Sequence, residues 1–336
     1  MRLLIFALII FLLTANCSQR YSQNNSPIRN FDFFWNEFDK HYAQFQIKGI
    51  HWDSIYNAYR PKIDKNTSDT LLFQYLSEIV SFIDDGHVNL YSPLGNASWN
   101  RNFDNYYSMK LINPRKYIEF GPRQSHSRLM EYRNLVGENI GILFLKSFKG
   151  QAKDYLIIDK IINEFKDKDG IIIDLRRNGG GRSSNSWLVA SRFADKKRLC
   201  YTYYEKNGKG KNDFTDWREK RVAPDGNSQF TKPVVILTSQ YTFSSAEVFV
   251  MCMQSFPQVS IVGDITAGGV GNPINRELPN GWRFRLSTKV AATRSKNIIE
   301  GKGIQPDCLI INTEEDFESG NDRIIEKAVE IINMAS

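Results

Sequence analysis

The chain has 336 residues, of which 41% are hydrophobic, enough to fill a substantial core. Its formal net charge of +7 comes from 44 Lys and Arg against 37 Asp and Glu, and both signs are interspersed along the chain. Because no basic block or RNA-binding signature is present, the charges indicate a solvated surface and no nucleic-acid partner. The length favours one large domain and a smaller one.

The N-terminus has the pattern of an export signal. The charged start Met1–Arg2 precedes an apolar run from Leu3 to Leu13, which is too short to span a bilayer as a stable helix. Cys17 and the polar stretch 18–26 follow, an order that resembles a bacterial lipoprotein signal. We therefore expect a signal over 1–17, a polar linker, and a lipid anchor at Cys17 in the cell envelope. The alternative is a plain cleaved signal and a periplasmic or secreted protein.

The other cysteines are Cys200, Cys252 and Cys308, an odd number without close pairing or metal-ligand spacing. Cys252 lies in the apolar stretch 248–253, which is typical of a buried small hydrophobe. We expect no disulfide, no metal and no organic cofactor.

The region before residue 90 has the periodicity of helices. Large apolar residues recur on one helix face from Phe31 to Phe45, and again from Ser68, a suitable N-cap, to Ile83. With the segment 52–59 between them, these patterns predict a small helical N-terminal unit over 27–90. Their aromatic stripes are typical of a core.

After a loop-rich connection over 91–136, buried strands alternate with helices. This pattern predicts an α/β core over 137–336 whose sheet is covered on both faces. The expected strands are 140–145, 170–174, 233–237, 259–262 and a partly exposed one over 282–291, and the expected helices are 155–165, 246–254 and 322–332.

One turn of this core is rich in glycine. The sequence Asp-Leu-Arg-Arg-Asn-Gly-Gly-Gly over 174–181 follows a predicted strand, and ligands of α/β sheets bind at the carboxyl ends of strands. Three glycines let the backbone approach a ligand closely and present N–H groups to an anion. The dinucleotide and phosphate-loop patterns are absent, which disfavours nucleotide binding. An oxyanion is the other candidate ligand.

A serine and a histidine also lie at junctions between elements. Ser244 lies in a strand-to-helix turn, at the positive end of the helix, where an alkoxide is favoured. Glu247, three residues later, completes a capping box, so Ser244 is either a nucleophile or an ordinary cap. Among four histidines, His87 lies in an Asp-Asp-Gly-His junction, where functional residues concentrate, although a surface or core role is the alternative.

Five ordered motifs resemble those of the C-terminal processing peptidases and the tricorn core peptidase. They are Asp-Gly-His at 85–87, the segment 173–181, the segment 238–247, Gly-Asp-Ile-Thr-Ala-Gly-Gly at 263–269, and Glu-Gly-Lys-Gly-Ile-Gln-Pro-Asp at 300–307. The resemblance extends from residue 31 to 332. It implies a crotonase-like α/β fold of mixed sheet and helices, and a serine peptidase that hydrolyses peptides or unfolded proteins through an acyl-enzyme.

The resemblance also implies roles for residues. Ser244 matches the nucleophile of the family, and the N–H groups of Ser245 and Gly180 match its oxyanion hole. Tail-specific members use a lysine base, but Gly269 stands at that position. A serine–lysine dyad is therefore not expected.

Tricorn-like members instead use a histidine that matches His87 and a glutamate that matches Glu300. An imidazole takes the hydroxyl proton near neutral pH, and a carboxylate fixes its tautomer and stabilises the imidazolium. Gly86 stands where the tricorn enzyme has a serine, so direct and mediated contact between Glu300 and His87 both stay open.

The means of substrate capture differs from that of most processing peptidases. About fifty residues separate His87 from Ile140, too few for a PDZ module with its connections. The loops 99–107 and 201–217 are alternative grips, or plain surface loops. The rival function is a catalytically inactive ligand- or peptide-binding protein on the same scaffold, because fold alone does not settle function.

Overall fold

The computed structural model describes residues 26–99, 106–119, 128–208 and 210–335. The chain forms two compact units. Of these described residues, unit 1 comprises those within 1–101, 205–215 and 271–289, and unit 2 comprises those within 102–204, 216–270 and 290–336. Within the described part of the chain, no helix is both long and apolar enough to cross a membrane. The predicted signal and Cys17, and most of the predicted 99–107 loop, lie outside the described residues.

Three helices of unit 1 follow the predicted periodicity. They are α2 (Pro27–His41), α3 (Trp52–Tyr59) and α4 (Asp69–Ile83). The hydroxyl of Ser68 accepts the N–H of Leu71 at 3.2 Å, so the predicted cap is confirmed. Helix α2 ends at His41 and not at Phe45, because the chain becomes extended at Tyr42 and the next N–H, that of Ala43, donates to the carbonyl of Ser287 at 2.9 Å.

Unit 1 also contains a sheet, which the prediction of a helical unit missed. Its antiparallel order is β10 (Pro273–Glu277), β11 (Arg283–Ser287), β1 (Asn89–Ser92) and β2 (Gly95–Ser98). The strand predicted over 282–291 is in fact two, β11 and β12 (Lys289–Thr293). Phe284 of β11 packs on Phe34 of α2 at 5.1 Å between ring centroids, which joins helices and sheet in one core.

Unit 2 is built on a mixed six-stranded sheet, as the predicted α/β core requires. Its order is β13 (Cys308–Leu309), β9 (Val259–Gly263), β8 (Val234–Thr238), β5 (Gly170–Asp174), β4 (Ile140–Leu145) and β3 (Met130–Asn134). All neighbouring pairs are parallel except β3 with β4. Strands β4 and β5 coincide with the predicted ranges residue for residue.

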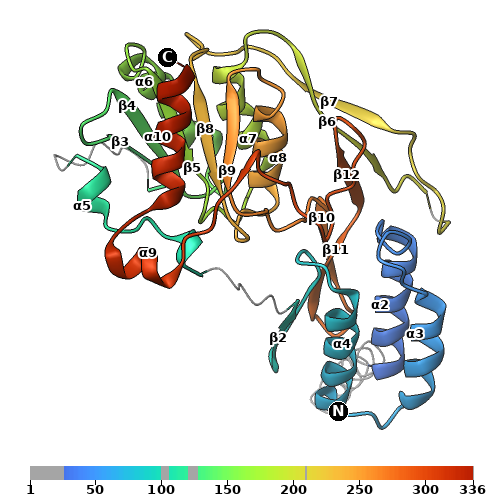
Figure 1. Cartoon of the computed structure of the whole chain (residues 1–336). Coiled ribbons are helices and arrows are strands. Elements are labelled where there is room, and N and C mark those ends of the chain that lie inside the picture. The colour runs from blue at the N-terminus through green and yellow to red at the C-terminus, as the bar shows by residue number, and fades with distance from the viewer. Residues whose placement is uncertain (1–25, 100–105, 120–127, 209, 336) are drawn as a thin grey trace, which may run out of the picture. The chain divides into compact units, whose positions relative to one another are not determined.

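Helices cover both faces of this sheet (Figure 1). One face carries α6 (Ile157–Glu164), α7 (Ser183–Ala190) and α8 (Ser245–Met253), and the other carries α10 (Arg323–Ala335). Because successive strand side chains point to opposite faces, Ile171 and Ile173 join the first core and Ile172 joins the second. Each fully buried side chain of this size stabilises the fold by roughly 1.5–3 kcal/mol.

The predicted 201–217 insertion is partly a strand pair. Strands β6 (Arg198–Glu205) and β7 (Arg218–Val222) lie in a three-stranded sheet with β12. The remaining elements are short: η1 (Arg60–Lys62), η2 (Tyr106–Met109), α5 (Pro114–Tyr117), η3 (Ala152–Tyr155), η4 (Ser191–Phe193) and α9 (Glu314–Ser319).

Candidate active site

Ser244 lies between β8 and α8, in the backbone conformation φ 58°, ψ −121°. A residue with a side chain pays roughly 1–3 kcal/mol for such a conformation, which persists only where its surroundings enforce it. Ser244 is also the N-cap of α8, so the N–H of Ser245 opens the helix and needs no partner within it. The turn therefore places a hydroxyl and a helix N-terminus side by side.

Glu247 enforces this conformation. Its side chain is fully buried, and one carboxylate oxygen accepts the N–H groups of Ser244 at 3.0 Å and Gly269 at 2.8 Å. The other oxygen accepts the N–H of Gly268 at 2.7 Å and the hydroxyl of Thr266 at 2.6 Å. Burial raises the pKa of Glu247, and these four hydrogen bonds oppose the rise. The sequence indicated only a capping box, whereas the carboxylate also binds the loop 266–269.

Gly180 lies directly against the serine. With φ at +90°, a Cβ on Gly180 would come 2.8 Å from Cβ of Ser244 and 2.9 Å from the nitrogen of Ser245, so only glycine fits. Its N–H, however, donates to Oδ1 of Asn178 at 2.9 Å. The structure thus brings Gly180 to the turn that contains Ser244, with the Gly180 N–H engaged inside its own loop.

Further hydrogen bonds join the Gly-rich loop and helix α7 to the start of α8. The Ser245 hydroxyl donates to the carbonyl of Gly181 at 2.7 Å, and the Ser186 hydroxyl donates to the carbonyl of Ser245 at 2.7 Å. The N–H of Phe243 donates to the carbonyl of Asn178 at 3.1 Å. Because these bonds lie on both sides of Ser244, the two turns form one rigid structure.

Glu300 lies in a turn that binds the same loop. The N–H of Gly301 donates to the carbonyl of Gly268 at 2.8 Å, and the N–H of Ile304 donates to the hydroxyl of Thr266 at 2.7 Å. Both acceptor residues are held by Glu247. The half-buried Glu300 is therefore connected to the turn that contains Ser244 through hydrogen bonds within unit 2.

Gly269 has no room for the lysine of tail-specific peptidases. A Cβ at this position would lie 2.2 Å from Cε2 of the Phe243 ring. The aromatic ring occupies the space that a longer side chain would need. Among the residues that the structure describes, no group of three or more His, Cys, Asp or Glu could hold a metal ion.

His87 belongs to unit 1, whereas Ser244, Ser245, Gly180 and Glu300 belong to unit 2. The imidazole is 4% exposed and lies in the turn between α4 and β1. Burial lowers the pKa of His87 to about 4, the charge of Arg285 adds to this effect, and Asp85 opposes it. His87 is therefore neutral at neutral pH, the form that accepts a proton.

The sequence alone did not indicate a role for Asp85, although Asp85 begins the Asp-Gly-His motif at 85–87. Its fully buried carboxylate accepts the N–H of His87 at 2.8 Å through Oδ1, which lies 3.9 Å from Nδ1 of the imidazole. Oδ2 accepts the hydroxyl of Tyr42 at 3.1 Å. Asp85 thus lies on the Nδ1 side of His87.

Comparisons with known proteins identify the family of the chain. The model of peptidase family S41 matches residues 139–310, and that of the tricorn protease C1 domain matches residues 25–81. The carboxy-terminal processing protease CtpA of Bacillus subtilis is 28% identical over 177 residues, which are 52% of this chain and 36% of that protein. The nisin-resistance protein of Lactococcus lactis is 24% identical over 201 residues, 57% of this chain and 63% of that protein. The chain thus spans less than two thirds of the length of these curated relatives.

Solved structures extend the likeness to nearly the whole chain. A candidate peptidase from Parabacteroides merdae is 31% identical with a TM-score of 0.81, over 92% of this chain and 97% of that one. Mature CPAF, at 12% identity and a TM-score of 0.71 over 92% of this chain and 96% of that one, shares the fold. Since the S41 match covers more than half of the chain and the P. merdae protein covers nearly all of it, the chain belongs to peptidase family S41.

Proposed function

We propose that the protein is a serine endopeptidase that cleaves peptide or unfolded-protein substrates through an acyl-enzyme. The observation that carries the proposal is the positive-φ conformation of Ser244, held by the buried Glu247 at the N-terminus of α8 and against Gly180. An ordinary helix cap needs neither the strain nor the close glycine. Backbone strain at a nucleophile turn is instead typical of a functional site.

In the proposed reaction, Ser244 forms the covalent bond to the substrate and His87 transfers the protons. His87 takes the proton of the Ser244 hydroxyl as Oγ attacks the substrate carbonyl carbon, which yields a tetrahedral oxyanion. As the C–N bond breaks, the imidazolium gives that proton to the leaving amine, and the acyl-enzyme remains on Ser244. A water molecule, deprotonated by His87, then releases the acyl group and restores the serine.

The base needs support when it becomes charged. Asp85 lies on the Nδ1 side of His87, where its negative charge favours the imidazolium and holds the ring in one orientation. We assign Glu300 the same electrostatic role from unit 2. The mechanism requires Nε2 of His87 to come within hydrogen-bonding reach of the Ser244 hydroxyl, about 2.6–3.2 Å.

The oxyanion is assigned to the N–H groups of Ser245 and Gly180. The Ser245 N–H is the first of helix α8, where the helix dipole also favours negative charge. The Gly180 N–H donates to Asn178 in this structure, so it serves the oxyanion only when it is shared with or released from that side chain. Ser245 is therefore the main donor.

Hydrolysis of unfolded casein tests the proposal. We expect the Ser244→Ala and His87→Ala variants to lose at least about a thousandfold in rate, because catalytic residues that act as a unit fail together. The matched controls Ser228→Ala and His51→Ala change exposed residues and should keep full activity. Full activity of either the Ser244 or the His87 variant would refute the assigned mechanism.

We also propose that the enzyme is exported and lipid-anchored at Cys17. The charged, apolar and small order of residues 1–17 supports this proposal. In a bacterial host, the wild-type chain should incorporate labelled fatty acid and fractionate with membranes, and the Cys17→Ser variant should do neither. Equal fatty-acid labelling of both chains would contradict the anchor.

A further inference from the structure

Unit 2 contains a cavity of about 650 Å³ at the carboxyl edge of its sheet. Its volume is in the range of small-ligand and side-chain pockets. Apolar side chains, among them Met109, Leu111, Ile118 and Phe144, form much of its lining. Arg177, Lys146 and Lys110 add cationic groups.

Part of the cavity lining is bonded to the Gly-rich loop of the candidate active site. Leu145 and Lys146 at the end of β4, and Arg177 just beyond β5, line it. Asn178 follows Arg177, and its side chain donates to the carbonyl of Leu145 at 2.8 Å. Ser147 lies two residues after Leu145, and its hydroxyl donates to the carbonyl of Gly180 at 3.1 Å. Two of the segments that line the cavity thus also hold the loop that places Gly180 against Ser244.

The order of strands in the sheet determines how far an extended substrate must run from Ser244 to the cavity. Strands β5 and β4 lie first and second beside β8, the strand that leads to Ser244. Neighbouring strands lie about 4.8 Å apart and an extended peptide advances about 3.3 Å per residue. A peptide that crosses the carboxyl edge therefore arrives at the cavity within a few residues of the scissile bond.

The unneutralised charge of the cavity is positive. Asp174 pairs with Arg176 at 2.7 Å, and Glu131 pairs with Lys146 at 2.8 Å. Arg177 is exposed, and its guanidinium forms no hydrogen bond or ion pair with any residue that the structure describes. An anionic group of a ligand is its natural partner, because a guanidinium binds a carboxylate through two parallel hydrogen bonds.

We propose that this cavity is a substrate subsite that binds a large apolar side chain, with the carboxylate of an adjacent Asp or Glu of the same peptide bound by Arg177. The inference rests on the proposed peptidase activity and specifies its substrate class. Because an endopeptidase substrate continues on both sides of the scissile bond, the carboxylate is that of a side chain. Exposure of Arg177 at the rim lets the rest of the chain pass into solvent.

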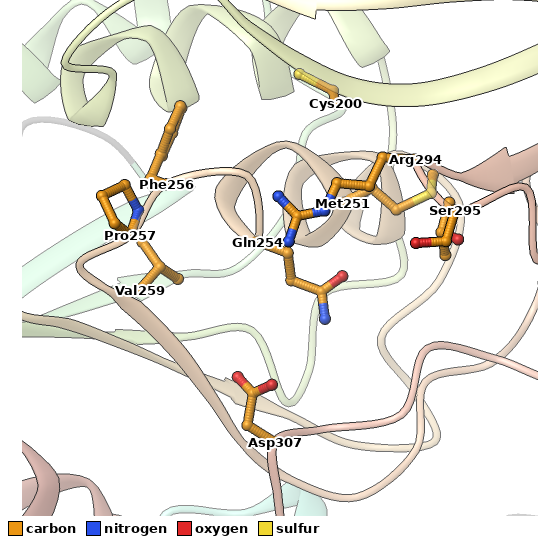
Figure 2. A pocket seen from close by; sticks show the side chains of 10 residues that line it. Cys200, Met251, Gln254, Phe256, Pro257, Val259, Arg294, Ser295 and Asp307 are labelled. Carbon is orange, nitrogen blue, oxygen red and sulfur yellow. The ribbon is translucent and has the colours of Figure 1, made fainter.

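A second cavity of unit 2 supplies a matched control. It measures about 420 Å³ and has a more polar lining, which includes Arg294, Gln254 and Asp307 (Figure 2). Arg294 is exposed and, like Arg177, forms no hydrogen bond or ion pair with the described residues. None of its lining residues belongs to the Gly-rich loop, so substitution of Arg294 should leave the subsite unchanged.

The test starts from cleavage sites in unfolded casein mapped by mass spectrometry. Internally quenched peptides built on one such site, all with amidated C-termini, then carry Glu, Gln or Lys beside the apolar residue. The wild type should cleave the Glu peptide with a kcat/KM roughly two- to fivefold above that of the Gln peptide, the scale of an exposed ion pair. Arg177→Gln should abolish this preference, Arg177→Glu should shift it to the Lys peptide, and Arg294→Glu should keep it.

Labelling of Ser244 by a fluorophosphonate distinguishes failure of the proposed subsite from failure of the proposed peptidase activity. If the wild type is labelled and cleaves casein but treats the Glu and Gln peptides alike, the subsite is wrong and the peptidase activity stands. If the preference survives in Arg177→Glu, or follows a free C-terminal carboxylate in place of Glu, the subsite is equally refuted. A wild type that is neither labelled nor active overturns the proposed function, and the subsite with it.

Discussion

At the scale of single residues, the candidate site depends on how closely two backbone segments approach. Gly180 has φ at +90° and lies against both Ser244 and Ser245. Gly137 has a similar φ of +73°, but a Cβ there would meet nothing within 4 Å. The two glycines thus share the backbone conformation and differ in their surroundings.

This pair gives a matched prediction. Gly137→Ala should cost only the conformational term of about 1–2 kcal/mol and keep activity. Gly180→Ala must in addition displace the turn at Ser244, and if Ser244 is the nucleophile, a displacement of about 1 Å can cost about a hundredfold in rate. Melting temperatures and casein hydrolysis of both variants measure the difference. Equal activity of the two would show that the contact with Ser244 has no catalytic importance.

The buried His87 predicts a pH dependence of stability. Its pKa falls from 6.5 to about 4 on folding, so the unfolded chain binds the extra proton between these values. The stabilisation is full above pH 6.5 and is lost as the pH falls towards 4, by roughly 3 kcal/mol in total. Urea denaturation of the wild type and of His87→Gln at pH 7.5 and 4.5 measures it. The variant should lose less stability than the wild type, and an equal loss would contradict the pKa.

The sequence indicates which turns contain these residues, but it does not indicate what surrounds them in the fold. Ser244 and His87 lie in recognisable turns, and a turn is a local feature that sequence reveals. The environment of His87 could not be predicted, because Asp85 meets Tyr42 only after α2 and the turn at 84–87 pack together. Likewise, the sequence identifies Gly180 as one of three glycines but does not reveal that Asn178 engages its N–H.

At the scale of elements, Glu247 connects helix α8 to the loop 266–269. One buried carboxylate accepts three backbone N–H groups and one hydroxyl. An amide in its place puts an NH₂ donor against N–H donors, and each unsatisfied buried group costs about 1–3 kcal/mol.

We therefore expect Glu247→Gln to lower both the melting temperature and the activity. The surface control Glu315→Gln on α9 should change neither, because Glu315 is exposed. Thermal denaturation followed by circular dichroism, with casein hydrolysis at 25 °C, checks both effects. A fully stable and active Glu247→Gln enzyme would reduce the carboxylate to an ordinary cap.

Elements were predictable where burial is uniform. Strands β4 and β5 are covered on both faces, so their continuous apolar runs identify them in the sequence. Strands β6 and β7 were missed because polar and exposed residues dilute their pattern, as in the exposed positions of β7. The end of α2 was misplaced because aromatic residues continue at helical spacing into a segment that pairs with Ser287.

At the scale of the whole molecule, each compact unit has its own core. Phe38 belongs to the core of unit 1 and Ile325 to a core of unit 2, and both are fully buried. Calorimetry should therefore resolve two transitions, as expected of a chain with two compact units. Phe38→Ala should lower the melting temperature of one transition and Ile325→Ala that of the other, because a core truncation lowers the free energy of unfolding by several kcal/mol. A single transition shifted by both variants would contradict two independent units.

The division into units could not be read along the chain. Segments 205–215 and 271–289 join the N-terminal helices in unit 1, although more than a hundred residues of unit 2 lie between those helices and the two segments in the sequence. Such membership is decided by pairing between strands distant in sequence, as in β11 with β1. Local periodicity contains no information about that pairing, so the sequence predicted a purely helical unit.

The central claim is that Ser244 is a nucleophile activated by His87, and covalent labelling tests it most directly. The purified protein is treated with a fluorophosphonate, and the adduct is located by mass spectrometry in the wild type, Ser244→Ala and His87→Ala. We expect one adduct, on Ser244, that is absent from Ser244→Ala and forms much more slowly in His87→Ala. An adduct on another residue, or unchanged labelling in either variant, would contradict it.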